Sequence, residues 1–324
     1  MKLITLLLAI CLVAPVAYGQ TLTEKDINDK GSLKPAKLVN APRKVYIQSF
    51  KVLYQMLAEA EATAHGGRQF GGGKVAGKAT ARMAVGVKGV DVPDLQEVTN
   101  QLYAEFVAEL KSNGFEIMTG KDAQGIKFYE NWELIEGPHV NQEQLPGYLM
   151  VAPEGYDYLV KRVTKKGKEK TTFLDKAYVV SKQMDDVIVA DVQFVLPSIW
   201  LDAKSSQFLG TAKVKGGPAF QLQNATVKFQ SGQGKGMIPK ASYYTMLKKP
   251  VPIPGVFKAE KFKAATLTQK TTVPSYASFF TVNNVKVDLG NYIECDANEY
   301  KTAAKNVMDQ YMGLVMDSFL ANAK

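Results

Sequence analysis

The stretch DLQEVTNQLYAEFVAELKSNGFEIM, residues 94–118, contains the clearest structural pattern in this sequence. Asp94 and Glu97 have the spacing of a capping box, and Gly114 suits the C-terminal end of a helix. Between them, apolar residues recur at the three- and four-residue intervals that mark one face of an α-helix: Leu95, Val98, Leu102, Phe106 and Leu110. A helix over about 94–113 is therefore predicted.

The end of the chain repeats this pattern. Asp296 and Glu299 again have capping-box spacing. An apolar face follows, made of Tyr300, Ala304, Val307, Tyr311, Leu314, Val315 and Phe319. A stripe of methionines lies along it, at Met308, Met312 and Met316, and we expect these side chains to fill a core rather than to bind a ligand. A second main helix is predicted over about 298–320.

Several segments between the two helices have the composition of strands. Residues 45–50 alternate in the two-residue period of a strand, and residues 187–196 form the apolar run of a buried central strand that ends at Pro197. Residues 56–64 fit either a strand or a helix. The predicted fold class is therefore α/β (α+β), with a mixed sheet packed by the two main helices and with long Gly/Pro-rich loops, of which 231–256 is one.

The N-terminus has the pattern of a secretory signal peptide. Lys2 precedes an apolar run over residues 3–16, and small residues stand before a cleavage point after Gly19. Cys11 lies inside the apolar run, and Ile10 stands where a lipoprotein signal needs a small residue, so lipidation is not predicted. The expected localisation is exported, in the periplasm or associated with the outer membrane.

These boundaries give an expected domain organisation. A signal peptide (1–19) precedes a flexible leader (20–42), and a single α/β domain spans 43–324, with insertions at 58–90 and 197–280.

Composition limits the class of protein. The chain has 324 residues, of which 46% are hydrophobic and 22% charged, and its formal net charge is +9. These values are ordinary for a folding chain and exclude a wholly disordered, collagenous or disulfide-rich protein. After removal of the signal peptide the only cysteine is Cys295, so burial of apolar surface has to stabilise the fold.

The Gly-rich segment 66–89 is unusual. From Lys78 to Val87 it alternates polar residues with small apolar ones, which predicts an extended strand with two different faces. One interpretation is a hairpin that pairs with neighbouring subunits or enters a membrane; the other is a flexible loop that leads into an ordinary core strand. The first interpretation predicts assembly residues in this segment: Gly71, Gly72, Gly73, Lys74, Lys78 and Arg82.

Lysines gather between residues 161 and 170. We expect Lys165, Lys166 and Lys168 to contact an anionic lipid or glycan surface, although a solvated loop has the same composition. Nucleic acid is not an expected partner, because no recognised nucleic-acid motif accompanies the lysines.

The common catalytic patterns are missing. His65 and His139 have no partner at zinc-ligand spacing, and no Gly-x-Ser-x-Gly motif is present. No catalytic residue, metal or cofactor is therefore predicted, and the protein is not expected to be an enzyme. The alternative is a carbohydrate-binding protein or hydrolase centred on Glu130, Trp132 and Glu133, because paired carboxylates cleave glycosides and aromatic rings stack on sugars.

The order of elements resembles the periplasmic α/β domain shared by curli-secretion-channel lipoproteins and the N-terminal domain of TolB-type proteins. The points of resemblance are the strand at 45–50, the helix at 95–113 with the turn and strand after it, the buried strand at 187–196 and the closing helix. Residues 89–110 also resemble uncharacterised exported proteins of Gram-negative bacteria. In the secretion-channel family, this resemblance implies ring assembly, with strands from each subunit lining an outer-membrane pore.

The sequence thus favours an exported, non-enzymatic envelope protein that acts as a binding or assembly module, oligomeric through its Gly-rich extended segment. Its expected partners are further copies of itself or other envelope proteins. A curli-channel-like pore subunit is the alternative implied by the resemblance.

Overall fold

A computed structural model describes residues 21–65, 78–172, 175–206, 211–258, 262–263 and 291–323. Its centre is a mixed sheet in the order β1-β17-β16-β12-β2-β8-β7, and β5 also pairs with β2. The strands of this sheet are β1 (Ile27–Asn28), β2 (Lys44–Gln55), β5 (Glu116–Met118), β7 (His139–Asn141), β8 (Tyr148–Ala152), β12 (Ile188–Leu196), β16 (Asn224–Gln233) and β17 (Pro239–Leu247). The predicted mixed sheet of an α+β fold is confirmed.

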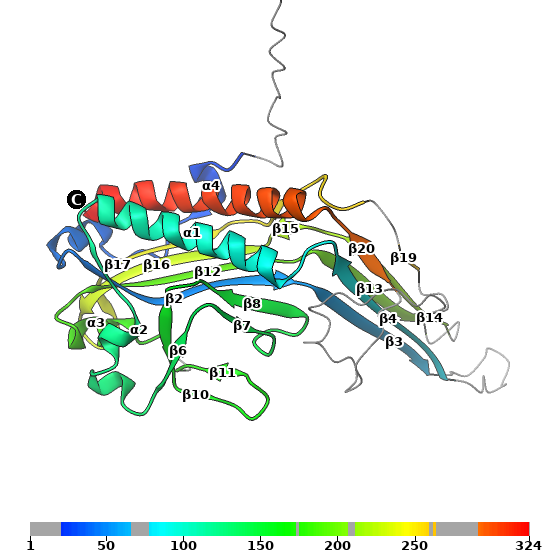
Figure 1. The fold of residues 1–324 in the computed structure, drawn as a ribbon, viewed down its shortest axis with the longest axis horizontal. Helices are drawn as coiled ribbons and strands as arrows, with labels where there is room; N and C mark the ends of the chain where they lie inside the picture. Colours follow the sequence, from blue (N-terminus) through cyan, green and yellow to red (C-terminus); the bar gives the residue numbers. More distant parts are fainter. Residues whose placement is uncertain are drawn as a thin grey trace, which may run out of the picture.

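Two long helices lie side by side along one face of this sheet (Figure 1). They are α1 (Val92–Ser112) and α4 (Ala297–Ala323), so both predicted helices are confirmed. Helix α1 begins earlier than its predicted cap, because the backbone N–H of Asp91 donates to Asp94 Oδ2 at 2.9 Å. At the start of α4, Asp296 Oδ1 accepts from the backbone N–H groups of Asn298 and Glu299.

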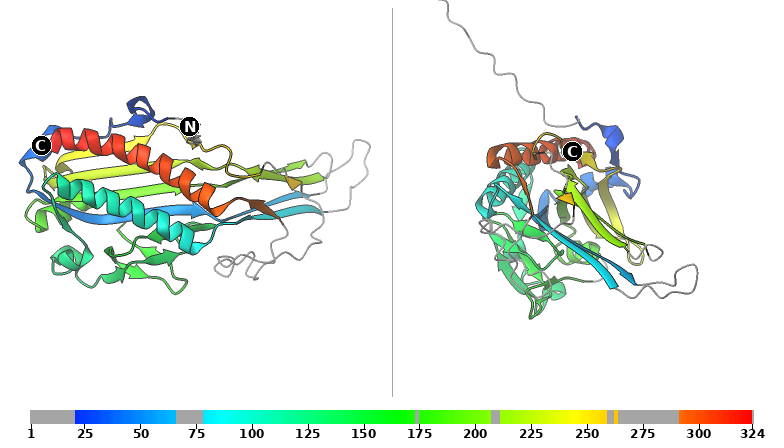
Figure 2. Two further views of the ribbon diagram at one scale, coloured as in Figure 1. Left: turned by 45° about the horizontal axis from the view of Figure 1, so that its top comes forward. Right: turned by 90° about the vertical axis from the view of Figure 1, so that its right-hand side faces the viewer.

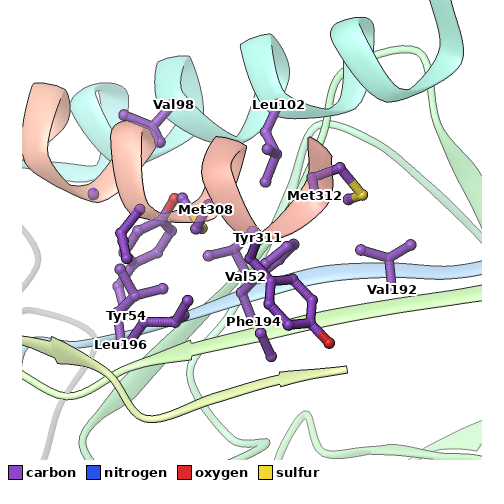
Figure 3. Close-up of a cluster of buried hydrophobic side chains, with 14 of the residues drawn as sticks. Val52, Tyr54, Val98, Leu102, Val192, Phe194, Leu196, Met308, Tyr311 and Met312 are labelled. Atoms are coloured by element: carbon purple, nitrogen blue, oxygen red, sulfur yellow. The ribbon is translucent and has the colours of Figure 1, made fainter. Parts of the chain in front are cut away.

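The main core lies between the helices and the sheet (Figure 3). Strand β12 alternates, and its residues on the helix side are fully buried: Ile188, Ala190, Val192, Phe194 and Leu196. The methionines of α4 at 308, 312 and 316 are buried in the same cluster, as the sequence predicted. The rings of Phe229 and Phe319 stack with centroids 3.7 Å apart and join β16 to α4.

Shorter elements cover part of the opposite face. Tyr46 and Val189 point to this side and pack with residues of α3, and the Tyr46 hydroxyl donates to that of Tyr129 at 3.2 Å. The elements here are α2 (Gly120–Ala123), η3 (Lys127–Tyr129), α3 (Ala177–Gln183), the pair β6 (Glu133–Glu136) with β9 (Asp157–Val160), and the pair β10 (Arg162–Val163) with β11 (Glu169–Lys170). Strands β2 and β12 are therefore covered over much of both faces.

Two expectations about loops need correction. Residues 21–42 are not a flexible leader in the structure: they contain η1 (Glu24–Asp26), β1 and η2 (Pro35–Asn40), and Leu22 and Leu38 are buried in the main core. The predicted loop 231–256 contains β17, a strand of the central sheet, as well as β18 (Val251–Pro252), which pairs with β15 (Gln221–Leu222). The predicted insertion 197–280 therefore includes two sheet strands, β16 and β17.

Candidate assembly surface

Two hairpins extend from one end of the central sheet and lie alongside each other (Figures 1 and 2). We call them the first arm, β3 (Leu57–His65) with β4 (Lys78–Lys88), and the second arm, β13 (Ile199–Ser206) with β14 (Thr211–Pro218). The first arm continues β2 and the second continues β12. The segment 56–64, which fitted a strand or a helix, is a strand.

The arms begin where the parallel pair of β2 and β12 separates. Pairing runs to Tyr54 opposite Leu196, and Pro197, which has no N–H, follows. Gln55 then bridges the gap, because its side-chain oxygen accepts from the backbone N–H groups of Ser198 and Ile199, both at 2.9 Å. On the other side, the Gly147 carbonyl accepts from the N–H groups of Met56 and Leu57. These bonds satisfy backbone groups that lose their ladder partners.

Both arms turn a face of small apolar residues inward. On the first arm this face consists of Ala58, Ala60, Ala62, Ala81, Met83 and Val85, and on the second it includes Leu201, Ala212, Val214 and Gly216. Met83, Val85 and Val214 are buried. A Cβ at Gly216 would lie 2.3 Å from Leu201 Cδ2 and 3.6 Å from Met83 Sδ, so a larger residue does not fit there without a shift. The arms therefore pack closely because their facing side chains are small.

The outward faces carry charge. Arg82 Nε lies 2.8 Å from Glu61 Oε2 across the first arm, and Lys204 pairs with Asp202 on the second. Lys213 and Lys215 are exposed on the same face of the second arm. Both arms thus alternate small apolar and charged residues, as the sequence predicted for 78–87.

A short strand anchors the base of the first arm. β20 (Tyr292–Glu294) runs parallel to β4, and the N–H of Gly86 donates to the Asn291 carbonyl at 3.0 Å. Lys88 pairs with Glu294 at 2.8 Å. Gly89 has a φ of +101°, and a Cβ on it would lie 1.9 Å from the Cys295 carbonyl oxygen, so only glycine fits. Burial and nearby carboxylates raise the pKa of the Cys295 thiol to about 12, so its reactive thiolate is disfavoured.

The direction of the backbone N–H groups in β4 can be followed from its base. The N–H of Gly86 points to Asn291, whereas the N–H of Val87 points to the Met56 carbonyl on the β3 side. Since N–H groups alternate along a strand, those of Arg82 and Ala84 point away from β3. Within the described residues, no strand pairs with this edge of β4 before Gly86. The edge therefore presents backbone N–H groups suited to strand addition, while the Ala84 carbonyl accepts from Asn291 Nδ2 at 3.4 Å.

The predicted assembly residues are only partly described. Gly71, Gly72, Gly73 and Lys74 lie outside the described residues, and Lys78 is the first residue of β4. Arg82 is on the outward face of the first arm. Sequence reasoning predicted neither the second arm nor the role of Gln55. The alternation of residues in 199–206 and 211–218 is the one sequence pattern that indicates the second arm.

The structure places Lys165, Lys166 and Lys168 away from the arms. They lie in the turn between β10 and β11, where Lys165 and Lys166 are exposed and Lys168 is half-buried. The backbone N–H of Lys168 donates to Thr164 Oγ1, which helps to close the turn.

The residues of the carbohydrate alternative also lie away from the arms. The ring of Trp132 contacts those of Phe128 and Tyr129, with centroids 5.4 and 4.9 Å away. Glu133 accepts from the Val163 N–H at 3.2 Å, and Glu130 is exposed at the side of a depression of about 510 Å³. Part of the Trp132 ring is thus used in packing.

Two acidic side chains, Glu169 of β11 and Asp191 of β12, have unusual surroundings. Burial acts to raise the pKa of Glu169, but hydrogen bonds from His139, Asn141 and Tyr158 and the charge of Lys51 outweigh it and hold the pKa low. Burial raises the pKa of Asp191 to about 7, and Lys51 opposes this effect. Glu169 is therefore held ionised by its partners, whereas Asp191 lies half-buried on β12.

Comparisons of the chain with protein families, with characterised proteins and with solved structures found no match. In the described ranges, no helix combines the length and apolar character needed to span a membrane. The same ranges contain no group of three or more His, Cys, Asp or Glu side chains placed to hold a metal ion.

Proposed function

We propose that this protein is an exported, non-enzymatic protein of the cell envelope that assembles with further copies of itself through its arms. The observation that carries the proposal is the edge of β4, where Arg82 and Ala84 direct their N–H groups away from β3. Strand addition gives such an edge the hydrogen bonds that it lacks within its own hairpin. The signal-peptide pattern of residues 1–19 supports export.

The form of the arms supports assembly rather than a role in folding alone. A two-stranded hairpin is marginally stable in water, and these two bury mainly alanine, valine and glycine against each other, with Met83 and Leu201 as the larger side chains. Pairing with another subunit adds backbone hydrogen bonds and covers a strand edge that otherwise invites uncontrolled association. A contact between the edge of β4 and a neighbour's edge other than that of β3 is heterologous, and repeated contacts of this kind close into a ring or continue as a filament.

A pair of proline variants tests the proposal. Ala84→Pro removes an N–H that points to the outer edge of β4. Glu59→Pro removes an N–H group on the outer edge of β3. This group points away from β4 because N–H groups alternate along a strand, and that of Leu57, two residues earlier, donates to the Gly147 carbonyl. Both variants keep the ladder between β3 and β4, so they are matched in chemistry and differ only in which edge they change.

The measurement is the native mass of the mature protein by light scattering over a range of concentrations. The proposal predicts an oligomer whose dissociation constant rises by about tenfold or more in Ala84→Pro and changes little in Glu59→Pro. Closed rings in negative-stain images, together with oligomers that dissociate only on heating, would favour the pore alternative. A monomer at every concentration, with and without outer-membrane lipid, would overturn the proposal.

A further inference from the structure

A basic groove lies at the end of the sheet opposite the arms. It is formed by η2 and by the turn between β16 and β17, and its volume is about 560 Å³. Strand β16 runs antiparallel to β12, so this turn lies beside the start of β12, whereas the second arm leaves from its end (Figure 1). The groove is therefore separate from the proposed assembly edge.

Four lysines line the groove: Lys34, Lys37, Lys235 and Lys240. Asp186 is the only carboxylate among the described lining residues, and it pairs with Lys240. Among the described residues, the other three lysines form no ion pair. The wall thus carries a net positive charge that its own acidic residue does not neutralise, and a phosphate group is a suitable counter-charge.

The rim of the groove is apolar. Ile238 lines the groove and is 51% exposed, and the adjacent Met237 is 64% exposed. These are two of the six large hydrophobic side chains that are exposed in the described part of the chain. Their position beside one basic groove distinguishes it from an ordinary lysine-rich surface.

We propose that this groove binds the phosphate headgroup of an anionic phospholipid, with the lysines on the phosphate and the apolar rim against the acyl chains. Charge alone would suit a free phosphate or an acidic peptide equally well. The exposed apolar rim favours a lipid, because lysines beside exposed apolar side chains are the combination that binds proteins to the surface of anionic membranes.

Vesicle binding tests the proposal. The mature protein is mixed with vesicles of phosphatidylcholine alone, or of phosphatidylcholine with an equal amount of phosphatidylglycerol, and bound protein is measured by flotation. We expect binding only to the anionic vesicles, weakened by about 30-fold in the double variant Lys37→Gln/Lys235→Gln. Ile238→Ser keeps every charge in the groove and is expected to weaken binding by about threefold to tenfold.

The double variant Lys165→Gln/Lys166→Gln removes the same charge from the exposed β10–β11 turn, where the sequence predicted contact with an anionic surface, so the two double variants distinguish the groove from that turn. Ala84→Pro is included so that a loss of avidity in the oligomer is distinguished from a loss of the groove. Thermal unfolding confirms that each variant folds.

Three outcomes would overturn the proposal. One is an equal loss in the Lys165 and Lys166 control, which would indicate unspecific attraction to charge. Another is unchanged binding in Ile238→Ser together with full competition by glycerol phosphate, which would indicate a site for free phosphate. The last is binding of polyglutamate that depends on the groove lysines and is as strong as binding of the anionic vesicles. This would indicate that the ligand is an acidic polypeptide.

Discussion

The body and the arms are built on the same two strands, yet they are stabilised differently. In the body, β12 places Phe194 against the ring of Tyr311, and the helices cover that face. Beyond Pro197 the same chain continues into the second arm, where Gly216 faces Met83 and Val214 is buried. The body therefore has a core that stabilises it alone, whereas the arms have close contacts but little apolar surface to bury. This difference is what directs our functional proposal to the arms.

The largest effect is expected in the body. Phe229→Ala removes a ring that stacks on Phe319 in the main core, and should lower the free energy of unfolding by about 3–5 kcal/mol. Urea denaturation of the Ala84→Pro background, at a concentration below its dissociation constant, measures this without a contribution from assembly. In the arms, Val214→Ala removes fewer buried atoms and should cost about 1–2 kcal/mol. Equal costs for the two variants would contradict the distinction between body and arms.

The junction between the two regions should show the next effect. Gly89→Ala adds a Cβ that collides with the Cys295 carbonyl at a positive φ, so we expect a loss of about 2–3 kcal/mol and release of β20 from β4. Gly114→Ala is the control, because Gly114 also has a positive φ, of +82°, but no atom within 4 Å of the added Cβ. Its expected cost is only about 1 kcal/mol. Equal losses in thermal unfolding would show that backbone strain, not the collision, limits this position.

A smaller effect should appear as pH dependence of the body. The pKa of Asp191 is raised to about 7 in the folded protein, above its ordinary value of about 3.9 in the unfolded chain. Between these values the folded state holds the proton more tightly, so this group makes stability fall as pH rises from about 4 to about 7, and adds no slope above that. Asp191→Asn should remove this part of the slope and make the protein more stable than wild type at pH 8. An unchanged difference between the two proteins across this range would show that Asp191 is ionised in both states.

The smallest effect is expected on the outward face of the first arm. Glu61 and Arg82 are 2.8 Å apart, but both side chains are largely exposed. Exposed pairs contribute about 0–1 kcal/mol, so Glu61→Gln should change stability by less than about 0.5 kcal/mol and leave the native mass unchanged. A large shift in either measurement would mean that this face, rather than the edge of β4, makes the intermolecular contact.

Local patterns were enough to predict the main elements of the body. The apolar spacing in 94–113 and 298–320 gave both helices, and the apolar run in 187–196 gave the central strand. The predictions were wrong where tertiary contacts override local composition. The glycines and prolines of 231–256 indicated a loop, yet Ala241, Tyr243 and Leu247 are buried on β17.

The candidate site was less predictable for the same reason. Alternation indicated an extended segment at 78–87, but nothing in it indicated that a second hairpin would pack against it. That contact depends on Gln55, which bonds to residues 143 and 144 positions away, and no local pattern reports so distant a pairing. The leader at 21–42 was misjudged because its polar composition hides the buried side chains of Leu22 and Leu38.

Residue-resolved hydrogen exchange of the mature protein tests assembly through the outer edge of β4 most directly. The amides of Met83 and Val85 point to β3 and should be protected at every protein concentration. Those of Arg82 and Ala84 should exchange quickly in dilute protein and become protected as the oligomer forms. Exchange at Arg82 and Ala84 that stays fast in the oligomer, or that is already slow in the monomer, would contradict assembly through the outer edge of β4.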